Sequence, residues 1–94
     1  MIQLTLKEAM AIAFDYWGLD AQGTDFKSNC RISSVCEDIG DRFVFSITQM
    51  DGAYFIGAPG LSVYKKDGRT EWFILLDEEN FKLLDKGKTV PLPA

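Results

Sequence analysis

Four short turn signals lie close together in the middle of this chain and constrain its fold more than any other feature. They occur at residues 38–41 (Asp-Ile-Gly-Asp), 51–52 (Asp-Gly), 57–60 (Gly-Ala-Pro-Gly) and 66–69 (Lys-Asp-Gly-Arg). An Asp-Gly pair is a strong hairpin signal, and glycine and proline interrupt strands. Because parallel strands need long crossover connections, tight turns at this spacing predict antiparallel pairing.

The segments around these turns have the composition of short strands. Phe43, Phe45 and Ile47 alternate with smaller or polar residues, which is typical of a half-buried strand. The polar segment 18–29 is expected to be a loop, and Pro91 and Pro93 indicate an extended tail. We therefore predict about five strands, over residues 31–37, 43–48, 53–56, 61–65 and 70–76.

Two segments carry helix signals. Thr5 and Glu8 have the spacing of a capping box, and Gly18 can supply a left-handed end, so we predict a helix over about residues 5–17. Its apolar stripe should pack on a sheet. Asp77 can cap a short second helix that ends at Gly87.

Length and composition fit one folded domain over residues 1–94. A chain of 94 residues with 47% hydrophobic residues can bury a single core. We expect an α+β fold in which the long N-terminal helix covers one face of a curved antiparallel sheet, with a short C-terminal helix after it. A cystatin-like helix-on-sheet arrangement is the nearest architecture.

The sequence predicts no catalysis and no cofactor. It has no histidine, which removes the commonest general base near neutral pH and the commonest neutral metal ligand. Two cysteines with scattered carboxylates do not form a recognisable zinc set. The adjacent pairs Glu37/Asp38 and Glu78/Glu79 point in different directions on a strand or helix. We therefore expect a non-enzyme without a metal site.

Charge and cysteine content bear on partners and compartment. Ten Lys and Arg against fourteen Asp and Glu give a net charge of −4, which opposes nucleic-acid binding. We find neither a signal-peptide pattern nor an apolar stretch of about 20 residues, so no membrane association is expected. Cys30 and Cys36 are too far apart along one strand to bridge unless the segment bends sharply, and we expect reduced thiols in a cytoplasmic protein.

The apolar run near the C-terminus suggests a protein-binding surface. A half-solvated strand should alternate, yet five large apolar residues end segment 70–76. If Trp72 faces the helix, then Phe73 faces away and is covered by the C-terminal segment, a partner or a second copy of the chain. Tyr54 and Phe55 can extend this patch or simply pack across strands. The aromatic candidates are Tyr54, Phe55, Tyr64 and Phe73.

Aspartates at the predicted turns are the second set of candidates for contacting a partner. Asp38, Asp41, Asp51 and Asp67 should all be exposed there, although Asp also favours turns for local reasons. In a simple meander, turns 38–41 and 57–60 lie at one end of the sheet. Turns 51–52 and 66–69 would lie at the other end.

The order of these features resembles a known family. The helix segment Glu8–Ala13, the strand segment 40–45 (Gly-Asp-Arg-Phe-Val-Phe) and the segment 57–69, which runs from Gly-Ala-Pro-Gly to Lys-Asp-Gly-Arg, look like the YrhB-like proteins. These are classed as immunity proteins of bacterial polymorphic toxin systems. The chain departs from the family pattern by a compact hairpin at 51–52. The resemblance implies a cytoplasmic protein that occludes a cognate toxin, and an acidic inhibitor is suited to a toxin with a basic surface.

Three functions follow from these observations. The first is a non-catalytic protein-binding module, an immunity protein that neutralises a toxin by occlusion. The second is a homodimeric structural or chaperone-like module that acts through an exposed apolar sheet face. The third is a small-ligand-binding domain, which requires a pocket lined by convergent polar groups.

Overall fold

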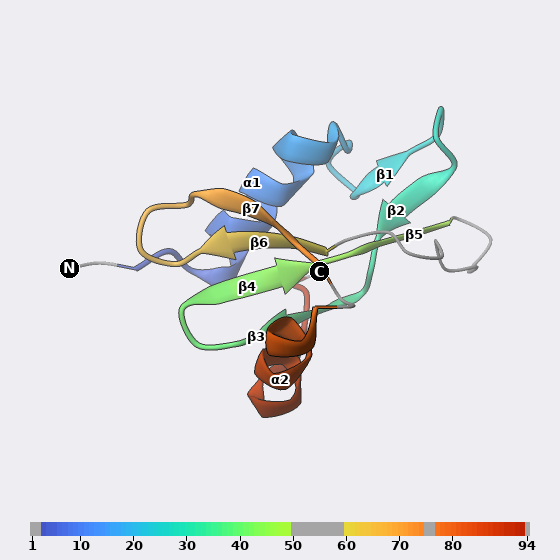
Figure 1. Ribbon diagram of the computed structural model, residues 1–94. Helices are drawn as coiled ribbons and strands as arrows, with labels where there is room; N and C mark the ends of the chain where they lie inside the picture. Colours follow the sequence, from blue (N-terminus) through green and yellow to red (C-terminus); the bar gives the residue numbers. More distant parts are fainter. Residues whose placement is uncertain (1–2, 50–59, 75–76, 94) are drawn as a thin grey trace.

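A computed structural model of the chain describes residues 3–49, 60–74 and 77–93. Those residues form a mixed α+β fold with two helices and two antiparallel sheets, so the predicted class is confirmed (Figure 1). The sheet with order β1-β2-β5 comprises β1 (Thr24–Asp25), β2 (Cys30–Ile32) and β5 (Ile47–Gln49). The sheet with order β7-β6-β4-β3-β8 comprises β3 (Val35–Asp38), β4 (Arg42–Phe45), β6 (Gly60–Tyr64), β7 (Thr70–Phe73) and β8 (Lys88–Pro91).

The helices begin and end close to where the sequence predicts. In α1 (Leu6–Trp17), the Glu8 N–H donates to Thr5 Oγ1 at 3.2 Å and the Thr5 N–H donates to Glu8 Oε1 at 3.0 Å, which completes the capping box. Gly18 ends this helix with φ of 69°. At twelve residues, α1 is of ordinary length rather than long. Asp77 caps α2 (Glu78–Lys86).

Helix α1 packs on one face of the five-stranded sheet (Figure 1). Ala9 and Ala13 are fully buried there, and their small side chains let the helix approach the strands closely. The sheet contributes Cys36, Phe43, Phe45, Leu61 and Val63 to the same core. Full burial of a side chain such as Phe45 stabilises the fold by about 2–3 kcal/mol. None of the described helices is long and apolar enough to cross a membrane.

The expectation of one curved sheet is wrong, because a long hairpin bends between two sheets. Predicted strand 43–48 divides at Ser46 into β4 and β5, and predicted strand 31–37 divides at residues 33–34 into β2 and β3. The Ser33 N–H donates to the Ser46 carbonyl at 2.8 Å, so both arms break at the same level. The hairpin therefore contributes β3 and β4 to one sheet and β2 and β5 to the other.

Two short strands occur where the sequence predicts none. The loop expected over residues 18–29 contains β1, which pairs with β2. The expected C-terminal tail contains β8, which pairs with β3 from Val35↔Pro91 to Asp38↔Lys88. Val90 and Leu92 pack against the core and hold this strand in place. The predicted strand 53–56 and the turn at 51–52 lie outside the described residues.

Strand β4 pairs directly with β6, from Arg42↔Tyr64 to Phe45↔Leu61. The start of one strand therefore lies beside the end of the other. This pairing brings the β3–β4 turn and the β6–β7 turn to the same end of the sheet, at the left of Figure 1. The sequence-based expectation that they lie at opposite ends is wrong, because it placed the segment 53–56 between these two strands.

Candidate protein-binding surface

Two adjoining turns form the strongest candidate surface. We call residues 38–42 and 64–69 the turn end. The Lys65 N–H donates to the Asp41 carbonyl at 3.0 Å, and Lys65 Nζ donates to Asp38 Oδ1 at 2.8 Å. The same ammonium lies 4.7 Å from the ring centre of Phe43, where a cation–π contact adds to the ion pair. The backbone and side chain of Lys65 thus link the β6–β7 turn to the β3–β4 turn.

Tyr64 is held between two arginines at the turn end. The guanidinium carbon of Arg42 lies 4.8 Å from the ring centre of Tyr64, and that of Arg69 lies 4.5 Å away. The Tyr64 hydroxyl donates to Glu71, and this hydrogen bond raises the pKa of the phenol. Arg42 also pairs with Asp41 at 3.0 Å and with Glu71 at 4.0 Å. Each side chain is therefore restrained by at least one other.

The structure brings together three of the four predicted aspartates. Asp41 and Asp67 are exposed, whereas Asp38 is half-buried, so full exposure was wrong for Asp38. Burial acts to raise the pKa of Asp38, but hydrogen bonds from Lys65 and from the Gly40 N–H outweigh it and the net pKa is lowered. Asp67 accepts from the Arg69 N–H at 3.0 Å, an ordinary turn interaction.

The turn end is not an acidic surface. With Glu71 and Lys88, which lie on the adjoining strands, it carries four acids and five bases. The acids are Asp38, Asp41, Asp67 and Glu71, and the bases are Arg42, Lys65, Lys66, Arg69 and Lys88. The remaining five bases and ten acids give the rest of the chain a net charge of −5. The acidic character of the protein therefore lies elsewhere.

The aromatic candidates fare differently from one another. Tyr64 is half-buried at the turn end. Phe73 is only 1% exposed, which fits the alternative that its face is covered, so its choice as a residue that contacts a partner is wrong. Phe73 lies opposite Gly60, where a side chain would collide with Val44 and with the Phe45 carbonyl. Tyr54, Phe55 and Asp51 lie outside the described residues.

Sequence reasoning missed two residues that the structure places beside Tyr64, and it did not choose Trp72 as a candidate. Arg42 and Arg69 were not singled out, because their positions over Tyr64 depend on strand register. Trp72 faces α1, which the sequence alone left as a condition, and its ring meets that of Tyr16 edge-on, with centroids 5.3 Å apart, yet Trp72 stays 45% exposed. Its place at the start of a run of five apolar residues was the available signal.

Neither cysteine has the environment of a nucleophile. Both are free and buried. Burial, followed by the nearby carboxylates of Asp38 and Glu37, raises the pKa of Cys36 to about 11. Burial also raises the pKa of Cys30. Thiolate, the reactive form, is therefore scarce near neutral pH. Over residues 3–49, 60–74 and 77–93, no group of three metal-binding side chains occurs.

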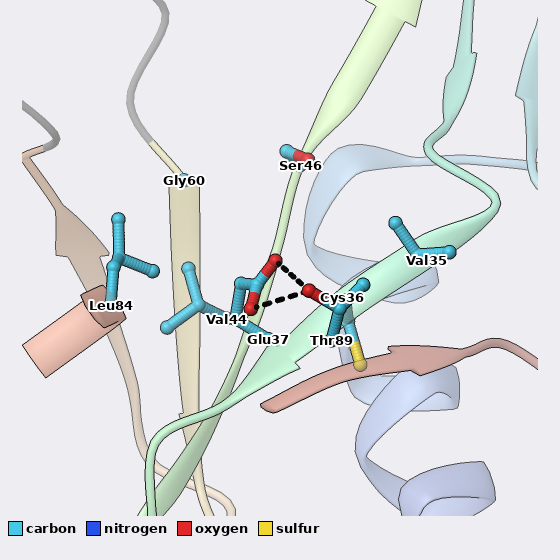
Figure 2. A pocket seen from close by; sticks show the side chains of 8 residues that line it. All are labelled: Val35, Cys36, Glu37, Val44, Ser46, Gly60, Leu84 and Thr89. Atoms are coloured by element: carbon cyan, nitrogen blue, oxygen red, sulfur yellow. Dashed lines mark hydrogen bonds between the residues drawn. The ribbon is translucent and has the colours of Figure 1, made fainter. Parts of the chain in front are cut away.

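An open cavity of about 370 Å³ lies over the sheet beside α2 (Figure 2). Val35, Val44 and Leu84 give it an apolar lining. Two of its polar side chains bond to each other, since the Thr89 hydroxyl donates to the two carboxylate oxygens of Glu37 at 3.0 Å and 3.2 Å, and Ser46 also lines the cavity. A wider groove of about 650 Å³ runs between α1 and β2. The small cavity lacks the convergent free polar groups that a specific ligand site needs.

Comparisons with protein-family models, curated proteins and solved structures find no significant match to this chain.

Proposed function

We propose that this chain is a non-catalytic protein-binding module, and that it acts as a cytoplasmic immunity protein which occludes a toxin through its turn end. The observation that supports this most is the Tyr64 ring held between Arg42 and Arg69. Tyrosine and arginine are enriched among residues that dominate binding energy at protein interfaces. The resemblance to YrhB-like proteins supports the class of partner.

Restraint of these side chains favours tight binding. Association costs about 0.5–1.5 kcal/mol for each flexible side chain that becomes ordered. Ion pairs and hydrogen bonds already hold Tyr64 and Arg42, so less of this cost remains to be met on binding. The contact surface is thus organised before a partner arrives.

The distribution of charge favours long-range attraction of a basic partner first and ion pairs at the turn end afterwards. The net charge of −5 over the rest of the chain favours approach of a basic protein, and this attraction weakens with salt. Exposed Asp41 and Asp67 can then accept ion pairs from the partner at the turn end. The small-ligand alternative is weaker, because Glu37, the only charged residue that lines the small cavity within the described chain, is bonded to Thr89.

Affinity capture from the native source, followed by titration of the captured toxin, tests the proposal. Tyr64→Ser and Asp41→Lys should each weaken 1:1 binding at least tenfold, because loss of a dominant contact costs about 2 kcal/mol or more. Phe81→Ser and Asp85→Lys, on exposed positions of α2, are the matched controls and should bind normally. A chain that captures no toxin, or whose binding survives both turn-end substitutions, would refute the proposal.

A further inference from the structure

Strand β7 is an edge strand with hydrogen-bonding groups directed outward. The Tyr64 N–H donates to the Arg69 carbonyl at 2.9 Å, which marks a hydrogen-bonded pair at the hairpin turn. Bonded and non-bonded pairs alternate along antiparallel strands. The backbone groups of Thr70 and Trp72 therefore point away from β6, and they have no backbone partner within the described part of the chain.

Strand β8, at the opposite edge, is protected against pairing. The Leu92 N–H donates to the Ser34 carbonyl at 3.0 Å, which marks a hydrogen-bonded pair. By the same alternation, the backbone groups of Thr89 and Pro91 point away from β3. Pro91 has no N–H to offer, and Lys88 adds a charge. Proline and lysine are devices by which edge strands avoid pairing with other chains. Strand β7 contains neither.

The β7 edge also has exposed apolar side chains beside it. Trp72 and Tyr16 are 45% and 48% exposed, and Ile74, just after the strand, is 51% exposed. Trp72 shares the helix-covered face with its cross-strand neighbour Leu61. The one charged residue of β7, Glu71, is tied to Tyr64 and so does little to guard the edge.

Charges at the two ends of β7 are opposite in sign. The turn before it carries Lys66, Asp67 and Arg69, a net charge of +1. The segment after it, Asp77 to Glu79, carries three exposed carboxylates. The Asp77 N–H donates to the Ile74 carbonyl at 3.2 Å, which holds this acidic segment close to the end of the strand.

We propose that β7 is the edge through which two copies of this chain pair. An antiparallel pair centred on Trp72 places that side chain opposite its counterpart and places Thr70 opposite Ile74 of the second copy. The basic turn of each copy then runs alongside the acidic segment of the other. Such self-complementarity is what a twofold interface requires. The two five-stranded sheets would join into one, and the turn 66–69, which is part of the turn end, would lie at the rim of this interface.

Sedimentation equilibrium of the full chain, over concentrations up to about 1 mM, tests this inference. The wild type should form a concentration-dependent dimer. Trp72→Lys should weaken the dimer at least tenfold, whereas Phe81→Lys, which also replaces an exposed aromatic residue by lysine, should leave it unchanged. Circular dichroism confirms that each variant is folded.

Charge reversal supplies a second arm. Lys66→Glu with Arg69→Glu makes the turn repel the acidic segment, and Glu78→Lys with Glu79→Lys makes that segment repel the turn, so each double variant should dimerise more weakly. The combined fourfold variant restores opposite signs and should recover the dimer. A wild type that is monomeric at every concentration overturns the inference, as does a dimer that Trp72→Lys leaves intact. Loss of a captured protein by Trp72→Lys in a monomeric wild type would assign the edge to a foreign strand instead.

Discussion

The two edges of the five-stranded sheet differ in opposite ways. Strand β7 is anchored by the buried side chain of Phe73, yet no proline or lysine in the strand hinders pairing through its outward backbone groups. Strand β8 contributes less buried surface, since Val90 is only half-buried, yet Lys88 and Pro91 hinder its pairing with another chain. The stability of a strand depends on side chains that point to the faces of the sheet, whereas its availability for pairing depends on backbone groups in the plane of the sheet. Stability of a strand therefore says little about its availability for pairing.

The largest expected effect is on stability, and it distinguishes Phe73 of β7 from Val90 of β8. Phe73→Ala should lower the free energy of unfolding by about 3–4 kcal/mol, because it leaves a cavity in well-packed surroundings. Val90→Ala should lower it by about 1 kcal/mol, because less buried surface is lost. Urea denaturation of both variants measures the difference, and equal losses would contradict the contrast between the two strands.

Alkaline pH should weaken the β8 side of the sheet through Cys36, which pairs with Val90. Its pKa in the folded protein, about 11, is above the unfolded value, so its stabilising contribution is complete below that unfolded value and is lost as pH rises toward 11. The loss should reach about 2 kcal/mol. Cys36→Ala should lack this component when unfolding free energies are compared at pH 8 and pH 11. The same pH dependence in both proteins would exclude the thiol as its source.

A smaller effect is expected at Asp38, which joins the β8 side to Lys65 of the β6–β7 turn. Its lowered pKa means that it stabilises the fold above the unfolded pKa, and that this contribution disappears as pH falls through the folded pKa. Asp38→Asn should therefore cost about 1 kcal/mol at neutral pH and almost nothing in strong acid. Asp41→Asn, on a more exposed carboxylate, is the control. A cost that persists in acid would point to packing instead.

The smallest expected effect tests whether Pro91 prevents β8 from pairing with another chain. Pro91→Ala restores an outward N–H and should change the unfolding free energy by less than about 0.5 kcal/mol. Combined with Trp72→Lys, it should produce weak association through the β8 edge, visible by sedimentation only at the highest concentrations. A strict monomer would show that Lys88 guards this edge without the proline.

Local signals predicted the local structure well. Thr5, Glu8 and Gly18 set the bounds of α1, and Asp77 marks the start of α2, because capping depends on residues only a few positions apart. The tight turns predicted antiparallel pairing. The cystatin-like comparison, the immunity-family resemblance and the compartment stay predictions.

Long-range features were harder to predict. Alternation from Phe43 to Ile47 continues through the bend at Ser46, so the sequence shows no break between the two sheets. Pro91 suggested a tail, although proline is tolerated at an outward edge position. Phe73 and Gly60 lie thirteen positions apart in the sequence and become cross-strand neighbours only through strand register. Tyr64 became a candidate through its expected place beside the apolar segment 70–76, whereas the positions of its two arginines follow from strand pairing.

The bond from the Lys65 N–H to the Asp41 carbonyl joins turns that are more than twenty positions apart in the sequence. A linear peptide copied from either turn would carry only half of the combined contour and none of the mutual support. Any miniature mimic of this protein would need to graft both loops onto a shared scaffold, side by side. Antibodies raised against the folded chain at this location should likewise recognise a discontinuous epitope that is lost on denaturing blots.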